Sequence, residues 1–161
     1  MKSIFNWILA VTLAAIGTSV VFAQAPKPEY AVAAFGGLLT GTDRGEWIGR
    51  LQFTDAAGKT HSLLEENVLD IVKNEQGIFV FTGLLHVGLN EGALYAVKRD
   101  THGVVGAQLV NRLPGAPSQI HLQPDGRTSF LVFTGKFDVQ QREIYKCYSL
   151  TGNAVSRGSG C

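Results

Sequence analysis

The sequence predicts an all-β fold, an antiparallel up-and-down meander with an internal repeat. Short runs of β-branched and aromatic residues alternate with turns rich in Gly, Asn and Asp, as in 68–99. The segment 78–95 reads as an apolar strand, a Gly-rich loop and a second strand, and weaker copies lie at 35–47 and 130–145. Leu94 and Ile144 are 50 residues apart, and Gly37 and Gly83 are 46 apart, so we expect repeats of about 46–52 residues.

Residues 1–23 have the pattern of a signal peptide. Lys2 precedes an apolar run at 4–22, and Val21-Phe22-Ala23 has small residues at the two positions that a signal peptidase inspects. We expect cleavage after Ala23, a leader at 24–29 and one domain at 30–161, in an exported protein that is periplasmic or secreted, with no membrane anchor after cleavage. An uncleaved anchor is the alternative, but Ala, Gly, Thr and Ser crowd the second half of the run.

The remaining chain is balanced in charge. Lys2 is the one charged residue of 1–23, which leaves 13 basic and 13 acidic residues. Binding of nucleic acid would need a basic surplus on one face, so we do not expect nucleic acid as the main partner.

The two cysteines, Cys147 and Cys161, predict a disulfide. In an exported protein an even cysteine count is typical of a bridge, and one closing so short a loop is worth about 3 kcal/mol in the chain-entropy model. We expect it to hold the C-terminal tail. An intermolecular bridge through Cys161 is the alternative.

The first third of the domain is expected to contain three strands. A strand is predicted at 30–35, and the glycines of 36–45 then predict a loop. Trp47, Leu51 and Phe53 alternate with polar or exposed positions, which predicts a half-buried strand at 47–53. A turn at 55–58 leads into a strand at 60–64.

The central unit is expected to be a complete four-stranded meander. Strands are predicted at 68–73, 78–82, 93–99 and 104–112, separated by turns at 74–77 and 100–103 and by the Gly-rich loop at 83–92. The run 78–82 is apolar at every position but the last, so we expect an internal strand covered on both faces. The prolines of 113–117 end the unit.

A further unit follows the same order. Strands are predicted at 118–122, 128–134 and 143–150, with a turn at 124–126, a loop at 136–141 and a last turn at 151–153. The first unit is expected to lack its first strand. In period and layout these units resemble β-propeller blades, but a propeller needs at least about four blades to close. Copies of the chain would then complete a ring as a homo-oligomer, or the meander would close as a barrel or sandwich of 10–12 strands.

This topology predicts that any binding site lies on one edge of the sheets. Alternate connections of a meander emerge together, which places the loops at 36–45, 83–92 and 135–142 beside 65–67 and 113–117. The opposite edge has the tight turns. Long loops on a rigid sheet are where binding is usually found. The candidate ligand- or partner-binding residues on this edge are Leu39, Asp43, Arg44, Leu85, His86, Asn90, Glu91 and Asp138.

The residues on this edge favour binding over catalysis. An apolar rim on this edge would be typical of an interface. Its members would be Leu38, Leu39, Leu84, Leu85, Val87 and Leu89. We therefore expect an exported, non-catalytic binding module for a protein or glycan, of the protein-interaction or inhibitor and immunity type, with no cofactor. The alternative is a metal-dependent hydrolase that uses His86, Glu91 and a neighbouring carboxylate. A self-assembling envelope component is the third possibility.

Three aromatic residues occupy similar places just after the predicted loops. They are Trp47, Tyr95 and Tyr145. A sugar-stacking platform is one interpretation, but aromatic residues at strand positions more often fill the core between sheets, and we expect the second.

Overall fold

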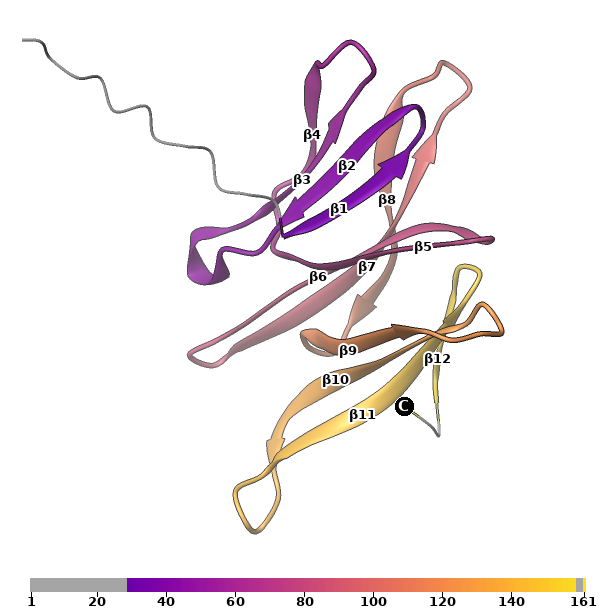
Figure 1. The fold of residues 1–161 in the computed structure, drawn as a ribbon. Helices are drawn as coiled ribbons and strands as arrows, with labels where there is room; N and C mark the ends of the chain where they lie inside the picture. Colours follow the sequence, from indigo (N-terminus) through magenta and orange to yellow (C-terminus); the bar gives the residue numbers. More distant parts are fainter. Residues whose placement is uncertain (1–28, 159–160) are drawn as a thin grey trace, which may run out of the picture.

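The computed structural model describes residues 29–158 and Cys161, and it is an all-β structure of three antiparallel sheets (Figure 1). Each sheet has four strands in sequence order. Within the described residues there is no α-helix, and the one helical turn is the 3-10 turn η1 (Gly45–Trp47). The predicted signal peptide and most of the leader lie outside the described residues.

The three sheets follow one another along the chain. The first sheet contains β1 (Tyr30–Ala34), β2 (Gly37–Thr42), β3 (Arg50–Thr54) and β4 (Thr60–Leu64). The second contains β5 (Val68–Asn74), β6 (Gly77–His86), β7 (Leu89–Arg99) and β8 (Val105–Leu113). The third contains β9 (Pro117–Leu122), β10 (Thr128–Phe137), β11 (Glu143–Thr151) and β12 (Ala154–Arg157).

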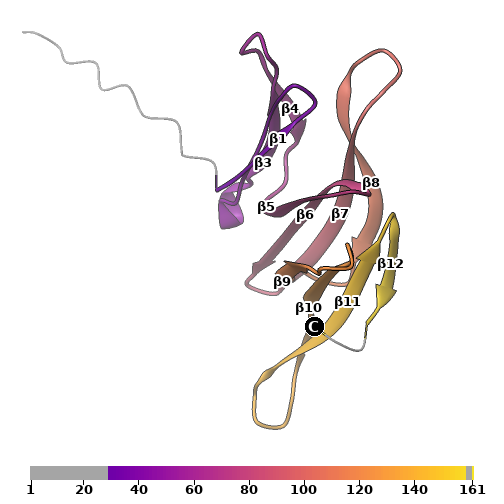
Figure 2. The same ribbon diagram turned by 45° about the vertical axis from the view of Figure 1, so that its right-hand side comes forward.

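The second sheet packs between the other two (Figure 2). Side chains of a strand point alternately to its two faces, so Ile78 and Val80 of β6 face the first sheet while Phe79 and Phe81 face the third. Ile78 and Val80 belong to one core cluster with Leu39, Leu51 and Phe53. Phe79 and Phe81 belong to a second cluster with Phe130, Val132 and Leu150. The prediction that 78–82 is an internal strand is confirmed.

The second cluster contains two aromatic contacts. The rings of Phe81 and Phe130 meet edge to face with centroids 5.0 Å apart, and Phe130 stacks on Tyr148 with centroids 5.8 Å apart. Phe81 and Phe130 are fully buried. Aromatic pairs of this geometry contribute about 0.5–1.5 kcal/mol beyond the area they bury.

The first strands of the three sheets are spatial neighbours. β1 lies close to β5, and β5 lies close to β9. The segments 65–67 and 114–116 each run from the last strand of one sheet to the first strand of the next. The sheets remain separate, so the described strands do not form the closed barrel that was the alternative prediction.

Two predicted Gly-rich loops are mostly strand. Residues 37–42 of the first form β2, and the second consists of the ends of β6 and β7 joined by the two-residue turn Val87-Gly88. Gly41 and Gly83 serve close packing, whereas Gly36 and Gly88 lie in turns with positive φ. A Cβ on Gly41 would lie 2.5 Å from Val68 Cγ1, and one on Gly83 would lie 3.1 Å from Ala116 Cα.

The first unit also differs from the prediction. It has all four strands, because β1 and β2 pair over their full lengths. Gly37 begins β2, whereas Gly83 lies near the end of β6, so the registration of Gly37 with Gly83 is wrong.

The cysteine prediction is confirmed within the chain. Cys147 and Cys161 form a disulfide with their Cα atoms 5.7 Å apart. Gly158 N also donates a hydrogen bond to Cys147 O at 2.9 Å. The end of the chain is thereby held on β11. Among the described residues, no helix is long and apolar enough to cross a membrane.

Substitution of Phe81 tests the role of the second sheet. Phe81→Ala leaves a cavity between the second and third sheets, so we expect the free energy of unfolding to fall by about 3–5 kcal/mol. Val139→Ala is the control, because Val139 is 90% exposed and should change stability by less than about 0.5 kcal/mol. Urea unfolding followed by circular dichroism measures both. Equal stability of the two variants would contradict the packing described.

Candidate functional site

The connections between strands lie on two opposite edges of the sheets (Figure 1). We name the edge at which the chain passes from one sheet to the next the connector edge; it contains 43–49, 65–67, 87–88, 114–116 and 138–142. The turn edge contains 35–36, 55–59, 75–76, 100–104, 123–127 and 152–153. The assignment of these connections to two edges agrees with the prediction, apart from residues 36–39. The predicted contrast between long loops and tight turns is not found, because both edges have connections of two and of five residues.

Leu38 and Leu39 do not lie on the connector edge. Leu38 pairs with Thr54, beside the turn at 55–59, so it lies toward the turn edge. Leu39 is fully buried and belongs to the first core cluster. The expectation that Leu39 contributes to a binding surface is corrected, because 37–42 is a strand and its alternation turns this side chain inward.

Asn67 organises the connector between the first two sheets. Its Oδ1 accepts hydrogen bonds from Arg44 N at 3.0 Å and Gly49 N at 2.5 Å, and its Nδ2 donates to Gly45 O at 2.5 Å. Its own carbonyl accepts from Gly83 N at 3.1 Å. One buried amide therefore fixes the loop 43–49 to the second sheet. The sequence prediction missed this residue, although an Asn directly before a buried strand was a possible signal.

Asn90 has the same role between the second and third sheets. Its Nδ2 donates to Phe133 O at 2.9 Å, and its Oδ1 accepts from Ala116 N at 2.9 Å. A Cβ on Gly115 would lie 2.5 Å from Asn90 Nδ2, so glycine is required for this approach. Asn90 was predicted to face a ligand, but both ends of its side-chain amide bind the protein's own backbone.

His86 is paired with a carboxylate that the sequence analysis did not single out. His86 Nε2 lies 3.0 Å from Glu46 Oε2, and both side chains are about half exposed. Among residues 29–158 and Cys161, no three His, Cys, Asp or Glu side chains are placed to hold one metal ion. The pair joins η1 to the end of β6 and offers a single carboxylate beside the imidazole.

Two other predicted residues shape their own loops. Asp43 Oδ1 accepts from Gly45 N at 2.8 Å. Asp138 accepts from the backbone of Gln140 at 2.8 Å and of Arg142 at 2.9 Å, and its Oδ2 lies 2.7 Å from Arg142 Nε. The Arg142 backbone hydrogen bond is the main cause that lowers the pKa of Asp138 below its ordinary value. Arg44 is exposed.

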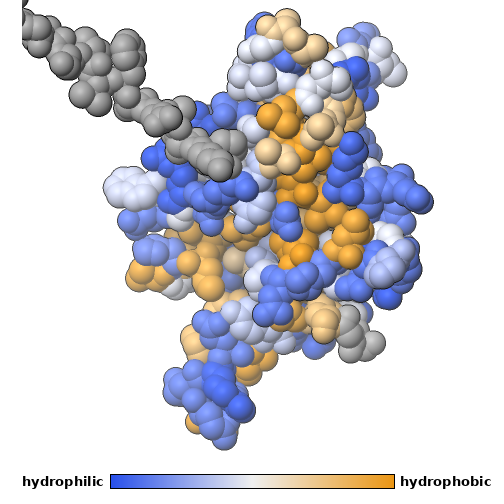
Figure 3. All heavy atoms as spheres, in the orientation of Figure 1, coloured by the Kyte–Doolittle hydropathy of each residue, from blue (hydrophilic) through white to orange (hydrophobic). Residues whose placement is uncertain are grey.

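Large apolar and aromatic side chains are exposed along the connector edge. Trp47 is 74% exposed, Val87 89% and Val139 90%, and each comes from a different sheet's connection. The others near this edge are Ile48, Leu85, Leu89, Phe137, Ile144 and Tyr145. Figure 3 shows apolar side chains around the end of the β6–β7 hairpin. Three aromatic residues were expected to fill the core. Tyr95 does, but Trp47 and Tyr145 are exposed, so the expectation is wrong for these two.

Val87 is in a backbone conformation that suits other residues better. It has φ 36° and Gly88 has φ 87° in the two-residue turn between β6 and β7. Such turns prefer Asn-Gly or Asp-Gly, because both central residues need positive φ. A β-branched residue with positive φ is an outlier, and Val87 is also apolar and exposed. Folding and solubility would both favour a polar residue here.

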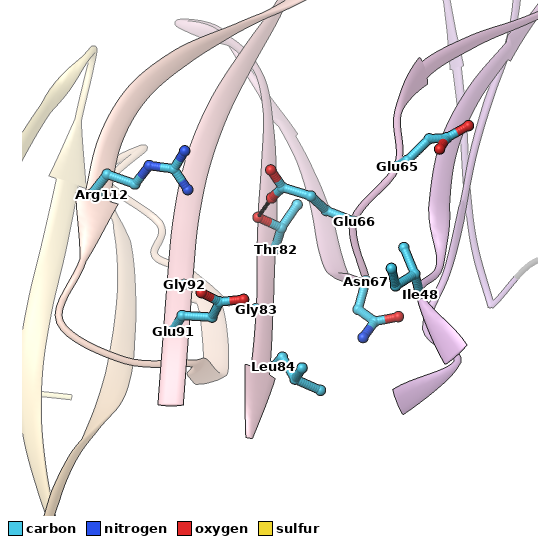
Figure 4. A pocket seen from close by; sticks show the side chains of 10 residues that line it. All are labelled: Ile48, Glu65, Glu66, Asn67, Thr82, Gly83, Leu84, Glu91, Gly92 and Arg112. Carbon is cyan, nitrogen blue, oxygen red and sulfur yellow. Dashed lines mark hydrogen bonds between the residues drawn. The ribbon is translucent and has the colours of Figure 1, made fainter. Parts of the chain in front are cut away.

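A pocket of about 170 Å³, which we name the acidic pocket, opens between the first and second sheets (Figure 4). Its charged lining residues are Glu65, Glu66, Glu91 and Arg112. Figure 4 shows the Glu66 carboxylate at Thr82, and Glu65 pointing away from it. Glu66 accepts hydrogen bonds from Thr82 Oγ1 at 2.6 Å and from the Tyr95 hydroxyl at 2.5 Å. Glu91 lies at the pocket's lower end, beside Gly83 and Leu84.

A second pocket, of about 220 Å³, lies where the three sheets meet, and we name it the apolar pocket. Leu69, Leu85, Pro117 and Phe133 provide apolar walls. Asp43 and Ser118 are polar members of the lining, and Ser118 Oγ is buried with no hydrogen-bond partner among the described residues. Mostly apolar pockets with a few polar groups are typical of binding sites.

Asn67→Ala tests whether this residue fixes the connector. The substitution leaves the Arg44 and Gly49 amides without their acceptor, so we expect the free energy of unfolding to fall by about 2–3 kcal/mol. Asn111→Ala is the matched control, because Asn111 is exposed and has no side-chain hydrogen bond among the described residues. Urea unfolding of both variants is the measurement. A loss as small as that of Asn111→Ala would contradict the assigned role.

The raised pKa of Tyr95 makes the free energy of unfolding depend on pH. Burial, then the hydrogen bond to Glu66 and its charge, raise the pKa of Tyr95 from 10.0 to about 12. The folded protein keeps the phenolic proton where the unfolded chain loses it, so this stabilisation is complete below pH 10 and is lost as the pH rises toward 12.

The variant Tyr95→Phe removes this titration. Its free energy of unfolding should therefore fall less steeply than that of the wild type between pH 10 and 12. Urea unfolding at a series of pH values measures the two slopes. Identical slopes would show that Tyr95 titrates with an ordinary pKa.

Comparison of the sequence with known protein families and with curated proteins finds no match in either.

Proposed function

We propose that this chain is an exported, non-catalytic binding module that holds a protein partner on its connector edge. The observation that carries the proposal is the set of exposed apolar side chains there, with Trp47, Val87 and Val139 contributed by three different sheets. Burial of apolar surface contributes about 25 cal/mol per Å², and large exposed apolar patches are typical of interaction sites.

Val87 gives independent support. A valine at this turn is unfavourable for the backbone and exposed to water, so local stability does not account for it. A contact with a partner would account for this valine. The stability that the valine costs the free protein is then compensated when its side chain is buried in the complex.

The rigidity of the edge also supports binding. Asn67 and Asn90 fix two of the connectors by hydrogen bonds to backbone groups. A surface that is ordered before binding loses less conformational entropy when the partner docks. The hydrolase alternative has no comparable support, since within residues 29–158 and Cys161 the one carboxylate paired with His86 is that of Glu46.

Export and a blade-like architecture are parts of the same proposal. The disulfide between Cys147 and Cys161 favours an oxidising compartment, in line with the signal-like residues 1–23. The closeness of β1, β5 and β9 favours blade-like repeats around a common axis. The outward face of the first sheet carries polar residues such as Thr40 and Thr42 of β2, which favours a finite stack of three over closure with a second copy.

Val87→Asn tests the proposal, because stability and binding should change in opposite directions. Asn suits the positive φ of this turn, so we expect the free energy of unfolding to rise by about 1 kcal/mol. The mature chain, immobilised, is used to recover proteins from the exported fraction, which are identified by mass spectrometry. Recovery by Val87→Asn combined with Val139→Asp should fall at least about tenfold, which is 1.4 kcal/mol of binding energy.

The matched control lies on the turn edge. Val104→Asp combined with Leu122→Asp changes residues that are 63% and 49% exposed, and it should leave recovery unchanged. Equal losses from the two double variants, or a loss confined to the turn-edge variant, would overturn the proposal. Recovery of glycans and no protein would replace the protein partner with a glycan.

A further inference from the structure

The two pockets of the connector edge adjoin. They share Gly83 and Leu84 at the end of β6, so the end of this strand is the wall between them. Leu84 lies on the face toward the first sheet and Leu85 on the face toward the third. A ligand that crosses the end of β6 would contact both pockets.

The apolar pocket has the size and lining to hold one bulky side chain. An apolar cavity of about 150 Å³ is sufficient for benzene, and this pocket measures about 220 Å³. Leu69, Leu85 and Phe133 can pack against an aliphatic or aromatic group. The Ser118 hydroxyl beside this pocket is buried and has no hydrogen-bond partner among the described residues, so the pocket's specificity comes from its apolar walls.

The charges of the two edges differ in sign. Around the connector edge there are eight carboxylates against five Lys and Arg side chains: Glu29, Asp43, Glu46, Glu65, Glu66, Glu91, Asp138 and Glu143 against Arg44, Arg50, Arg112, Lys136 and Arg142. Around the turn edge there are four against five: Asp55, Glu75, Asp100 and Asp125 against Lys59, Lys73, Lys98, Arg99 and Arg127. Glu66 and Glu91 make no ion pair within the described part of the chain, whereas Arg142 is paired with Asp138. The connector edge therefore suits a basic ligand.

We infer that the connector edge binds an extended protein segment in which a bulky apolar side chain lies close to a Lys or Arg. The apolar side chain enters the apolar pocket, and the cation lies at the acidic pocket near Glu66 and Glu91. Residues of an extended segment are about 3.3 Å apart, so a spacing of one or two positions spans the end of β6. This inference rests on the proposed function and specifies the chemistry of its partner.

Three synthetic peptides test the inference. They share one Gly/Ser frame and differ in a central Leu-Gly-Lys, Leu-Gly-Glu or Ser-Gly-Lys, and their binding to the mature chain is followed by NMR chemical shifts. We expect Leu-Gly-Lys to bind at least about tenfold more tightly than either of the others. We expect its advantage over Leu-Gly-Glu to decrease as salt is added, because exposed charges are screened.

Variants of the protein, each with a matched control, show which pocket binds the Leu and which binds the Lys of the peptide. Leu85→Asn should weaken both Leu peptides, whereas Leu109→Asn, at a similarly exposed leucine of β8, should not. Glu91→Gln should reduce the preference for Lys over Glu at least about threefold, and Glu75→Gln on the turn edge should leave it unchanged. The folded state of each variant is checked by its NMR spectrum.

The outcomes separate this inference from the proposed function. If no peptide binds, or Leu-Gly-Glu binds as well as Leu-Gly-Lys, while recovery of proteins still depends on Val87 and Val139, the inference is overturned and the proposed function stands. If recovery does not depend on Val87 and Val139, both fall. Self-association that Val87→Asn abolishes and the Leu-Gly-Lys peptide does not displace would replace the segment with a second copy of the chain.

Discussion

The structure depends on the packing of one sheet on both of its faces. Alternation along β6 turns Ile78 and Val80 toward the first sheet and Phe79 and Phe81 toward the third, so a single strand belongs to both core clusters. Full burial of each such side chain contributes about 1.5–3 kcal/mol. The outer sheets have an apolar face on one side only. Without the second sheet neither would have a partner against which to bury it.

The connector edge follows from this stack. Because each sheet is an antiparallel meander, the connections between sheets emerge at the same edge as the β2–β3, β6–β7 and β10–β11 connections. The buried amides of Asn67 and Asn90 then join neighbouring sheets at that edge. The core clusters and these hydrogen bonds form the base from which exposed residues such as Val87 and Val139 extend, and it is to these residues that we assign the proposed contact with a partner.

Much of the fold could be predicted from the sequence. Apolar alternation and Gly-containing turns predicted most strands, and the unbroken apolar run at 78–82 predicted the internal strand. The glycines were harder to interpret. Gly36 has positive φ in a turn. Gly41 and Gly83 instead lie in strands and allow Val68 and Ala116 to approach them closely. Composition alone does not distinguish these two roles of glycine.

The site was less accessible to sequence reasoning. The glycines of 36–45 and 83–92 predict loops, and this interpretation places Leu39 and Asn90 on the surface. Both point inward, since the next sheet covers them. The partner of His86 is 40 residues away in sequence, at Glu46, and such proximity depends on how the sheets stack. The exposure of Trp47 depends on the 3-10 turn, for which the sequence has no clear signal.

The central claim is that the second sheet holds the three sheets together as one folding unit. Native-state amide hydrogen exchange across a series of low urea concentrations tests it most directly. The account predicts that amides of β6 and β7 exchange only through global unfolding, and that the most protected amides of β2 and β10 approach the same opening free energy and urea dependence. If β6 and β7 exchange through a smaller opening while either outer sheet stays protected, the second sheet does not have this role.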